Sequence, residues 1–355
     1  MNLSLSPALD KLINLKIEKV ENILVVRQHN QLGDMLCSLT LYAALKKKFP
    51  DSRITLVAAK TYYEIPFYEI NPYLDRVITF DKQNSRTILN FFRSLRERKY
   101  QLGIVPSTIK VSRTSHIINF LSGAKVRVGV KSITGVRNPS HTLLNVKSDF
   151  SWENSHQLER NLDVVKQINC DLSEEDKLFL KFRYSDEDKR YARNFIEENF
   201  PGNHRKIIGF HPGAGKADNM WSTKKFTELI IKLFNKYNNY VLLTMGKIDG
   251  AVISTVEDEL KKHNIDYKIL GPIPIKKQGA ILSLVDLYIT NDTGSMHIAG
   301  FSDAKMISLF GPTNPNEWAP QGINKHFIKS RTGNINDISV DEVFNLSKKI
   351  LEEEK

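Results

Sequence analysis

Cysteines are rare in this sequence, and long apolar runs are absent. Cys37 and Cys170 are the only two cysteines among 355 residues, too few for a disulfide framework or a zinc site. Apolar runs are short, such as residues 23–26 and 241–243, whereas a membrane-spanning helix needs about 20 apolar residues. The first residues also lack the basic segment and the apolar core of a signal peptide. We therefore expect a cytoplasmic protein without a membrane-spanning helix.

Acidic residues are too few to balance the basic ones. The chain carries 51 Lys and Arg against 40 Asp and Glu, a net charge of +11. Residues 1–150 hold 23 basic and 11 acidic residues, and residues 151–355 hold 28 and 29, so the excess lies in the first half. It predicts an anionic partner, which could be nucleic acid, a membrane surface or a phosphorylated substrate. Because aromatics are not interleaved with the basic residues as in RNA-binding sheets, we expect no nucleic-acid partner.

Short β-rich runs alternate with helical segments, which favours an α/β fold of about two domains. In open α/β sheets, ligands bind at the carboxyl ends of the strands. The expected strands cover residues 22–26, 53–58, 77–80, 102–105, 126–129, 206–210, 240–245, 268–270, 287–290 and 306–310. Helices are expected at residues 35–49, 224–237 and 339–354, and a helical segment at 158–200 is expected to cross between the domains.

The turn at Gln31–Asp34 follows the first expected strand. Gly33 permits a tight backbone there, and Asp34 would stand near the start of a helix, at the ligand edge of the sheet. Asp34 is either a helix N-cap, whose side chain accepts bonds from unpaired amides, or a general base that takes a proton from a substrate hydroxyl.

A glycine-rich loop follows the first expected strand of the second half. It is not a P-loop, because five residues instead of four separate Gly209 from Gly215, and Ala217 instead of Ser or Thr follows Lys216. The loop either brings its glycine amides close to a phosphate or simply connects a strand to a helix.

Another turn opens a helix after the strand expected to end at residue 290. The amides of Thr293, Gly294 and Ser295 would point outward there with the positive end of the helix dipole, as an anion site. Asp292 is most simply a cap of this helix. His297 either faces a phosphate or makes a core contact.

The acidic run 186–188 matches a metal-binding pattern of some sugar transferases. It precedes Lys189, Arg190 and Arg193 on an expected helix, so acidic residues in a first helical turn explain it better. No metal site is expected.

Taken together, these segments resemble glycosyltransferase family 9, which includes the ADP-heptose:lipopolysaccharide heptosyltransferases. The resemblance covers nearly the whole chain. Its segments come in order: ILVVRQHNQLGD from Ile23, SGAKVRVGV from Ser122, HPGAGKADNMWSTKKFTEL from His211, DLYITNDTGSMHIAG from Asp286 and ISLFGPTNP from Ile307.

The resemblance implies a GT-B fold, in which two Rossmann-like α/β domains face each other across a cleft. Residues 1–180 would form the acceptor-binding domain, and residues 181–335 would bind the nucleotide-sugar. A C-terminal helix in residues 336–355 would return toward the N-terminal domain.

The resemblance also implies roles for individual residues. Asp34 falls on the catalytic base, and Arg27 and Arg127 fall on basic positions near the acceptor or a phosphate. The implied donor contacts are Asp292, Thr293, Gly294, Ser295, His297 and Lys216 for the diphosphate, and Asp249, Ile273 and Pro274 for the nucleoside. Asn219 departs from the family, which often carries a phosphate-binding Lys there; Lys216 could substitute for it from the same loop.

The implied activity is inverting, metal-independent glycosyl transfer. The donor would be ADP-heptose as a co-substrate, with no further cofactor. The acceptor would be a lipopolysaccharide core or a related anionic lipid-linked glycan, met at the inner face of the cytoplasmic membrane by a peripheral enzyme. The alternatives are a GT-B transferase that uses another nucleotide-sugar and a GT-B sugar-nucleotide epimerase.

Overall fold

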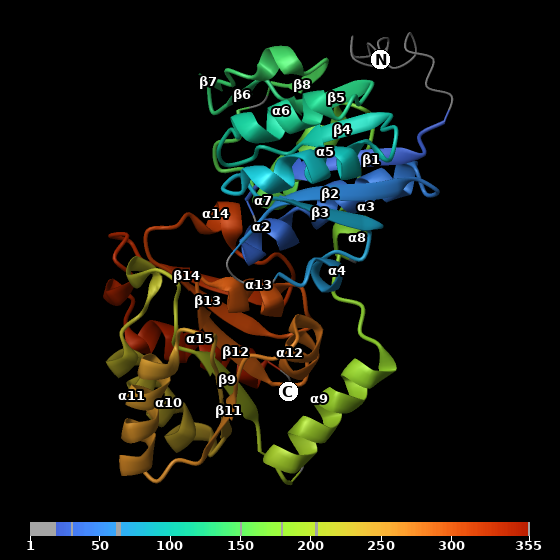
Figure 1. Ribbon diagram of the computed structural model, residues 1–355. Helices are drawn as coiled ribbons and strands as arrows, with labels where there is room; N and C mark the ends of the chain where they lie inside the picture. Colours follow the sequence, from blue (N-terminus) through green and yellow to red (C-terminus); the bar gives the residue numbers. More distant parts are fainter. Residues whose placement is uncertain are drawn as a thin grey trace. The chain divides into compact units, whose positions relative to one another are not determined.

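The chain folds into two α/β units that divide between Leu180 and Lys181 (Figure 1). We refer to them as the N-terminal and C-terminal domains. The computed structural model describes residues 19–29, 31–61, 65–149, 151–178, 180–202 and 205–353. The segment inspected for a signal peptide precedes these ranges. None of the helices in the described ranges is both long enough and apolar enough to span a bilayer.

The N-terminal domain is built on a parallel sheet. Its central strands are continuous apolar runs, as expected for strands covered by helices on both faces. Among the described residues the strand order is β3-β2-β1-β4-β5-β8. The strands are β1 (Asn22–Arg27), β2 (Arg53–Ala59), β3 (Arg76–Phe80), β4 (Leu102–Val105), β5 (Val126–Val130) and β8 (Val146–Ser148), and an antiparallel pair lies apart from them, β6 (Ser132–Ile133) with β7 (Val136–Arg137).

Helices connect the strands of this domain. They are α2 (Leu32–Cys37), α3 (Leu39–Lys48), α4 (Phe67–Ile70), α5 (Ile88–Arg96), α6 (Arg113–Leu121), α7 (Gln157–Lys166) and α8 (Glu174–Leu178), with 3-10 turns η1 (Ser85–Thr87) and η2 (His141–Leu143). The single helix expected at 35–49 is two helices. The break falls at Ser38, whose hydroxyl donates to the Met35 carbonyl oxygen at 2.7 Å, a local bond that competes with helical pairing.

The helical segment expected at residues 158–200 does cross between the domains, and it is broken into three helices. It consists of α7, α8 and then α9 (Asp186–Asn199), and the domains divide between α8 and α9. Helix α9 begins with a capping box, in which Ser185 and Asp188 satisfy each other's backbone amides. The acidic run 186–188 therefore forms a first helical turn, as expected.

The C-terminal domain repeats the parallel-sheet design. Among the described residues its strand order is β11-β10-β9-β12-β13-β14. The strands are β9 (Ile207–His211), β10 (Tyr240–Thr244), β11 (Tyr267–Leu270), β12 (Leu287–Asn291), β13 (Met306–Phe310) and β14 (Lys325–Lys329). In each sheet the order reverses beside the first strand, between β1 and β4 and between β9 and β12. Ligands of doubly wound sheets bind at this crevice.

The helices of the C-terminal domain complete its core. They are α9, α10 (Thr223–Tyr237), α11 (Gly250–Lys262), α12 (Ile275–Leu282), α13 (Gly294–Gly300), α14 (Pro315–Trp318) and α15 (Val340–Glu352), with 3-10 turns η3 (Ala217–Asn219) and η4 (Ile335–Asp337). The last helix, α15, packs Val343, Ile350 and Leu351 into the apolar core of this domain. Its return toward the N-terminal domain stays a prediction.

Trp221 anchors the loop after β9 to this core. The fully buried indole meets Phe226 edge to face at 5.1 Å, and its Nε1 donates to the Ile338 carbonyl oxygen at 3.0 Å. The loop that carries Lys216 and Asn219 is thereby fixed next to the carboxyl edge of the sheet.

We expect Trp221→Ala to lower the free energy of unfolding by about 3–5 kcal/mol, because the removed ring leaves a cavity. Urea denaturation measures this change. The matched control is Leu89→Ala on α5, whose side chain is 81% exposed and whose loss should change stability by no more than about 0.5 kcal/mol. Equal small effects of both substitutions would contradict the anchoring role.

Candidate active site

A buried ion pair lies at the carboxyl end of β1. Arg27 is the last residue of that strand, and its Nη2 lies 3.5 Å from Oδ1 of Asp34 in α2. The two residues are only 4% and 5% exposed. Opposite charges at this distance attract each other strongly when buried. The pair places a carboxyl group and a cation together at the ligand edge of the sheet, where a general base would be needed.

Asp34 is not the cap of its helix. The N-cap position belongs to Gln31, whose side chain makes no capping bond, and Asp34 is the third residue of α2. The interpretation of Asp34 as an N-cap is therefore wrong. The role of catalytic base stays a prediction.

Arg27 is also held from the side of α7. Its Nη1 donates to Oδ1 of Asn161 at 3.1 Å, and the amide nitrogen of Asn161 donates to the Gln157 carbonyl oxygen at 2.7 Å.

The nearby Cys37 thiol is buried, and burial together with the charge of Asp34 raises its pKa to about 12. The thiol therefore stays neutral and packs as a small apolar group.

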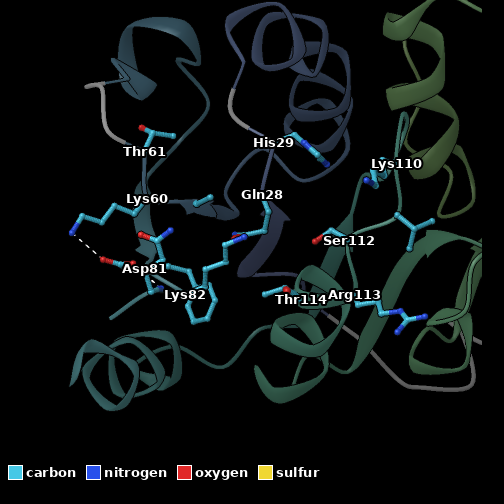
Figure 2. A pocket seen from close by; sticks show the side chains of 14 residues that line it. Gln28, His29, Lys60, Thr61, Asp81, Lys82, Lys110, Ser112, Arg113 and Thr114 are labelled. Carbon is cyan, nitrogen blue, oxygen red and sulfur yellow. Dashed lines mark hydrogen bonds and ion pairs between the residues drawn. The ribbon is translucent and has the colours of Figure 1, made fainter. Parts of the chain in front are cut away.

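A basic pocket of about 430 Å³ opens at the same edge of the N-terminal sheet. Its walls come from the ends of β1, β2 and β3 and from the start of α6 (Figure 2). Lys60, Lys82, Lys110 and Arg113 line it, and among the described residues of its lining Asp81 is the one acidic side chain. Lys60 Nζ lies 2.9 Å from Oδ2 of Asp81. The excess positive charge suits an anionic ligand.

The basic pocket continues toward Arg27. A smaller hollow shares Gln28, His29 and Lys110 with the pocket, and its own lining includes Arg27. The ion pair and the basic pocket therefore belong to one continuous region at the carboxyl edge of the sheet.

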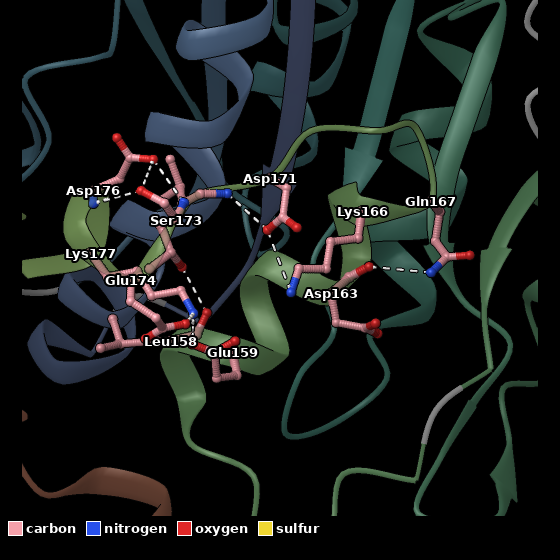
Figure 3. Close-up of polar contacts among 12 residues, drawn as sticks. Leu158, Glu159, Asp163, Lys166, Gln167, Asp171, Ser173, Glu174, Asp176 and Lys177 are labelled. Atoms are coloured by element: carbon pink, nitrogen blue, oxygen red, sulfur yellow. Dashed lines mark hydrogen bonds and ion pairs between the residues drawn. The ribbon is translucent and has the colours of Figure 1, made fainter. Parts of the chain in front are cut away.

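Polar contacts fix α7, the helix that orients Arg27 (Figure 3). Lys177 of α8 pairs with Glu159 at 2.6 Å and with Glu174 at 2.7 Å. At the other end of α7, Lys166 lies 3.4 Å from Asp171. Exposed pairs of this kind are worth about 0–1 kcal/mol each, but the side chain of Lys177 is only 9% exposed. These contacts connect α7 to α8 and to the segment that follows α7.

Arg127 is not brought to the ion pair. Its Nε donates to the Leu143 carbonyl oxygen at 2.7 Å, and its Nη1 donates to that of Ala124 at 2.9 Å. It is the second residue of β5, toward the amino edge of the sheet. These contacts give Arg127 a structural role, and its contact with an acceptor phosphate stays a prediction.

In the C-terminal domain, α13 begins at Gly294 with Thr293 as its N-cap residue. Asp292 precedes the cap, so its interpretation as a helix cap is wrong. The amides at the start of α13 lack partners within the helix. The Thr293 hydroxyl oxygen is buried and finds no hydrogen-bond partner among the residues that the structure describes. Together these groups could bind the oxygens of an anion.

Asn219, which departs from the family pattern, is part of this turn. Its amide nitrogen donates to Oδ2 of Asp292 at 3.0 Å and to the Asp292 carbonyl oxygen at 3.3 Å. A second link comes from Asn291, which donates to the carbonyl oxygens of Pro212 and Gly213 at 3.0 and 3.1 Å. The glycine-rich loop and the α13 turn are therefore bound to each other, and the loop is more than a plain connection.

Two lysines place positive charge near Asp292. Burial raises the pKa of the Asp292 carboxyl, while a hydrogen bond from Thr313 and the charges of Lys216 and Lys329 oppose the rise. Lys216 is exposed in the glycine-rich loop. Lys329, at the end of β14, donates to the Gly311 carbonyl oxygen. Either lysine can supply the positive charge that Asn219 does not.

A buried chain of hydrogen bonds runs beneath the α13 turn. The Tyr288 hydroxyl is bonded to the Ser295 hydroxyl at 2.5 Å and to the Thr244 hydroxyl at 2.7 Å. Nδ1 of His211 lies 3.0 Å from the Thr244 hydroxyl, and its Nε2 lies 3.7 Å from Asp249. Burial raises the pKa of Tyr288 to about 12 and lowers that of His211. The chain connects the predicted diphosphate turn to the predicted nucleoside contact.

Asp249 faces the protein interior. It is 5% exposed, and its carboxylate accepts a bond from the Gly246 amide at 2.6 Å. A Cβ at position 213 would come within 2.3 Å of this carboxyl group, so only glycine fits there. Contact of Asp249 with a ribose stays a prediction.

The remaining predicted donor residues lie at the same edge. Ile273 and Pro274 stand between β11 and α12, and Gln278 of α12 donates to the Ser295 hydroxyl at 3.3 Å. His297 is 6% exposed and meets the Trp318 ring at 6.0 Å. Of its two interpretations, this contact favours packing in the core.

Comparison with known proteins identifies the family. The chain belongs to glycosyltransferase family 9 (heptosyltransferase), whose sequence model matches residues 88–346. It is 24% identical to lipopolysaccharide heptosyltransferase 3 of Escherichia coli over 310 residues, which cover 82% of this chain and 84% of that relative. The protein is therefore a glycosyltransferase of the heptosyltransferase type, as the sequence predicted.

Solved structures confirm the fold class. E. coli ADP-heptose LPS heptosyltransferase II has a TM-score of 0.74 at 22% identity, covering 94% of this chain and 99% of that one. UDP-GlcNAc 2-epimerase from Neisseria meningitidis, bound to UDP-GlcNAc, has a TM-score of 0.53 at 12% identity and covers 93% of each chain. At these identities the likeness shows the GT-B fold alone, which transferases and epimerases share.

The sequence did not reveal several residues of the site. Tyr288, Thr244 and Asn161 are unremarkable within their segments and become notable only through their buried hydrogen bonds. Lys329 lies on β14, a half-exposed edge strand that the sequence did not predict. No local pattern indicates these positions, because their partners lie far away in the chain.

We expect Arg27→Met to lower the free energy of unfolding by about 3 kcal/mol, because the buried Asp34 carboxylate loses its cation. Adding Asp34→Asn should restore part of the loss, as urea denaturation of single and double variants will measure. Arg53→Met, at an exposed position of the same sheet, serves as the control. Additive losses in the double variant would mean that the two side chains do not interact.

Proposed function

We propose that the protein is an inverting glycosyltransferase that moves heptose from ADP-heptose to an anionic lipid-linked glycan, such as a lipopolysaccharide core. The observation that carries this proposal is the buried Arg27–Asp34 pair beside a basic pocket, at the ligand edge of the N-terminal sheet. Membership of family 9 and the names of its relatives, which include lipopolysaccharide and ADP-heptose heptosyltransferases, support the choice of substrates.

Asp34 acts as the general base in the proposed reaction. The acceptor hydroxyl oxygen attacks the anomeric carbon, and its proton passes to an Asp34 carboxylate oxygen. The bond from the anomeric carbon to the diphosphate breaks, and its electron pair leaves with the nucleoside diphosphate. A single displacement from the opposite face inverts the anomeric centre. Arg27 favours the ionised carboxylate before the proton arrives.

The C-terminal domain binds the donor in this proposal. Charge develops on the leaving diphosphate, so preorganised donors aimed at its oxygens lower the barrier. The amides of Gly294 and Ser295 and the unpartnered hydroxyl of Thr293 can serve as these donors. Lys216 and Lys329 contribute the positive charge near Asp292. The buried Tyr288 chain keeps the Ser295 hydroxyl in place.

The basic pocket of the N-terminal domain binds the acceptor in this proposal. Phosphates or acidic sugars of the glycan meet Lys60, Lys82, Lys110 and Arg113, which line it. The net excess of basic residues in residues 1–150 also favours a peripheral position on the anionic inner face of the membrane.

We expect Asp34→Asn to keep donor binding but to lower the rate of transfer by about 10²–10⁴-fold, the usual contribution of a positioned base. Turnover is measured with a radiolabelled donor, and donor affinity is measured by calorimetry. Asp51→Asn, which removes an exposed carboxylate of the same domain, is the control and should retain full turnover. Near-normal turnover of Asp34→Asn would exclude Asp34 as the base.

A thermal-shift panel of ADP-, GDP- and UDP-sugars tests the donor. ADP-heptose at saturating concentration should raise Tm by several degrees, because a ligand at about 100 times its Kd adds about 2.7 kcal/mol. A response confined to UDP-sugars would contradict the heptose assignment. Incubation of the enzyme with donor but without acceptor tests the epimerase alternative, because an epimerase converts the nucleotide-sugar without a second substrate.

A further inference from the structure

Helix α6 presents three apolar side chains to solvent, although its fourth, Ile118, packs into the core of the domain. Ile117, Phe120 and Leu121 are 50%, 48% and 37% exposed. They stand three and four residues apart and so share one face of the helix. His116 and Asn119, in contrast, are buried. Only Ile118 faces the core, whereas the apolar stripe of a surface helix usually does so as a whole.

Specific hydrogen bonds fix this orientation of α6. The Asn119 amide donates to the Gly103 carbonyl oxygen at 3.2 Å. His116 Nδ1 lies 2.8 Å from the Ser112 carbonyl oxygen, and its Nε2 lies 2.9 Å from the Asn138 amide. Turning the helix to bury Ile117 and Phe120 would break these bonds, so the apolar face is a stable feature of the domain.

Further exposed apolar residues lie on the segments next to α6 in the chain and in space. The contact between His116 and Asn138 places the β6–β7 hairpin beside α6 (Figure 1). Val136 of that hairpin is 72% exposed, and Ile109, shortly before α6, is 46% exposed. The Arg127 guanidinium stacks 5.2 Å from the Phe120 ring centre. We define the α6 face as Ile117, Phe120 and Leu121 with the basic residues around them.

The segment that contains the α6 face carries no negative side chain. Residues 102–148 include no Asp or Glu. Their basic residues are Lys110, Arg113, Lys125, Arg127, Lys131, Arg137 and Lys147. Exposed apolar side chains among basic ones are the combination that inserts between anionic lipids and binds their headgroups. Two copies of the same face would repel each other, which argues against a symmetric dimer.

The α6 face also adjoins the basic pocket. Ser112, Arg113 and Thr114, at the start of α6, line that pocket, and the exposed apolar residues follow on the same helix. A lipid surface against α6 would therefore hold a lipid-anchored glycan close to the opening that is proposed to receive it.

We propose that the α6 face docks the enzyme on an anionic phospholipid bilayer, with Ile117, Phe120 and Leu121 inserted at the headgroup level. That this docking assists the transfer reaction depends on the proposed function, in which the acceptor is lipid-linked. The binding itself depends only on the α6 face and can be measured without any transfer reaction.

Co-sedimentation of the full chain with vesicles tests the docking. The vesicles are pure phosphatidylcholine or its equal mixture with phosphatidylglycerol. The unaltered chain should bind the mixed vesicles and bind pure phosphatidylcholine much more weakly. Ile117→Ser/Phe120→Ser should weaken binding about tenfold or more, since both side chains lose their apolar insertion. Lys125→Ser should weaken it about fivefold, the equivalent of about 1 kcal/mol per basic residue.

Matched controls come from the other domain. Ile323→Ser removes an apolar side chain that is 94% exposed, and Lys261→Ser removes an exposed lysine of α11. Both should bind vesicles like the unaltered chain. Unchanged binding by the α6 variants would overturn the proposal. A change in the oligomeric state of these variants, measured by sedimentation, without a change in vesicle binding would also overturn it. The α6 face would then be a contact between copies of the chain.

Transfer to a deacylated, water-soluble acceptor separates this proposal from the proposed function. Ile117→Ser/Phe120→Ser should transfer to the soluble acceptor at the normal rate and lose rate only with the vesicle-embedded acceptor. Equal loss with both acceptors would mean that the substitutions damage the fold, which overturns the docking role. Absence of transfer by the unaltered chain would contradict the proposed function, while vesicle binding would still decide the docking.

Discussion

The ion pair between Arg27 and Asp34 is the constraint on which the N-terminal site depends. Two opposite charges are buried at the end of a central strand, where either charge alone would be costly. Their burial requires a partner from each side, so α2 supplies the carboxylate and α7 supplies Asn161 to the same guanidinium. Two other features act on the helices that meet at Arg27. The break at Ser38 ends α2, and the polar contacts of α8 hold α7.

The candidate site of the C-terminal domain is also held by buried polar contacts, but these come from neutral side chains. Its turn at the start of α13 is held by side-chain amides, Asn219 on Asp292 and Asn291 on the glycine-rich loop. Beneath it, Tyr288 connects Ser295 to Thr244 and His211 in a buried chain in which every hydroxyl is bonded. Satisfied buried networks are rigid. An anion site built from backbone amides needs this rigidity, since its donors must be in place before the charge arrives.

Much of the fold was predictable from the sequence because the central strands are uniformly apolar. The expected strands at 22–26, 102–105 and 306–310 agree with β1, β4 and β13. The errors fall where tertiary contacts override local pattern. The helical segment expected at 158–200 is three helices, and the edge strand β14 lacks the apolar run that made the other strands recognisable. Asp34 and Asp292 were plausible caps by position, but the caps are Gln31 and Thr293.

The sequence by itself determined the family, the two parallel sheets and the turns that carry the candidate site, because these depend on apolar periodicity and on motifs of neighbouring residues. Only the tertiary structure decided what each side chain faces. It paired Arg27 with Asp34 and set Arg127 against Phe120 on the amino-edge side. It also turned Ile117, Phe120 and Leu121 of α6 outward while burying His116 and Asn119. The physical reason is that burial and hydrogen bonding depend on partners distant in the chain, which local spacing does not encode.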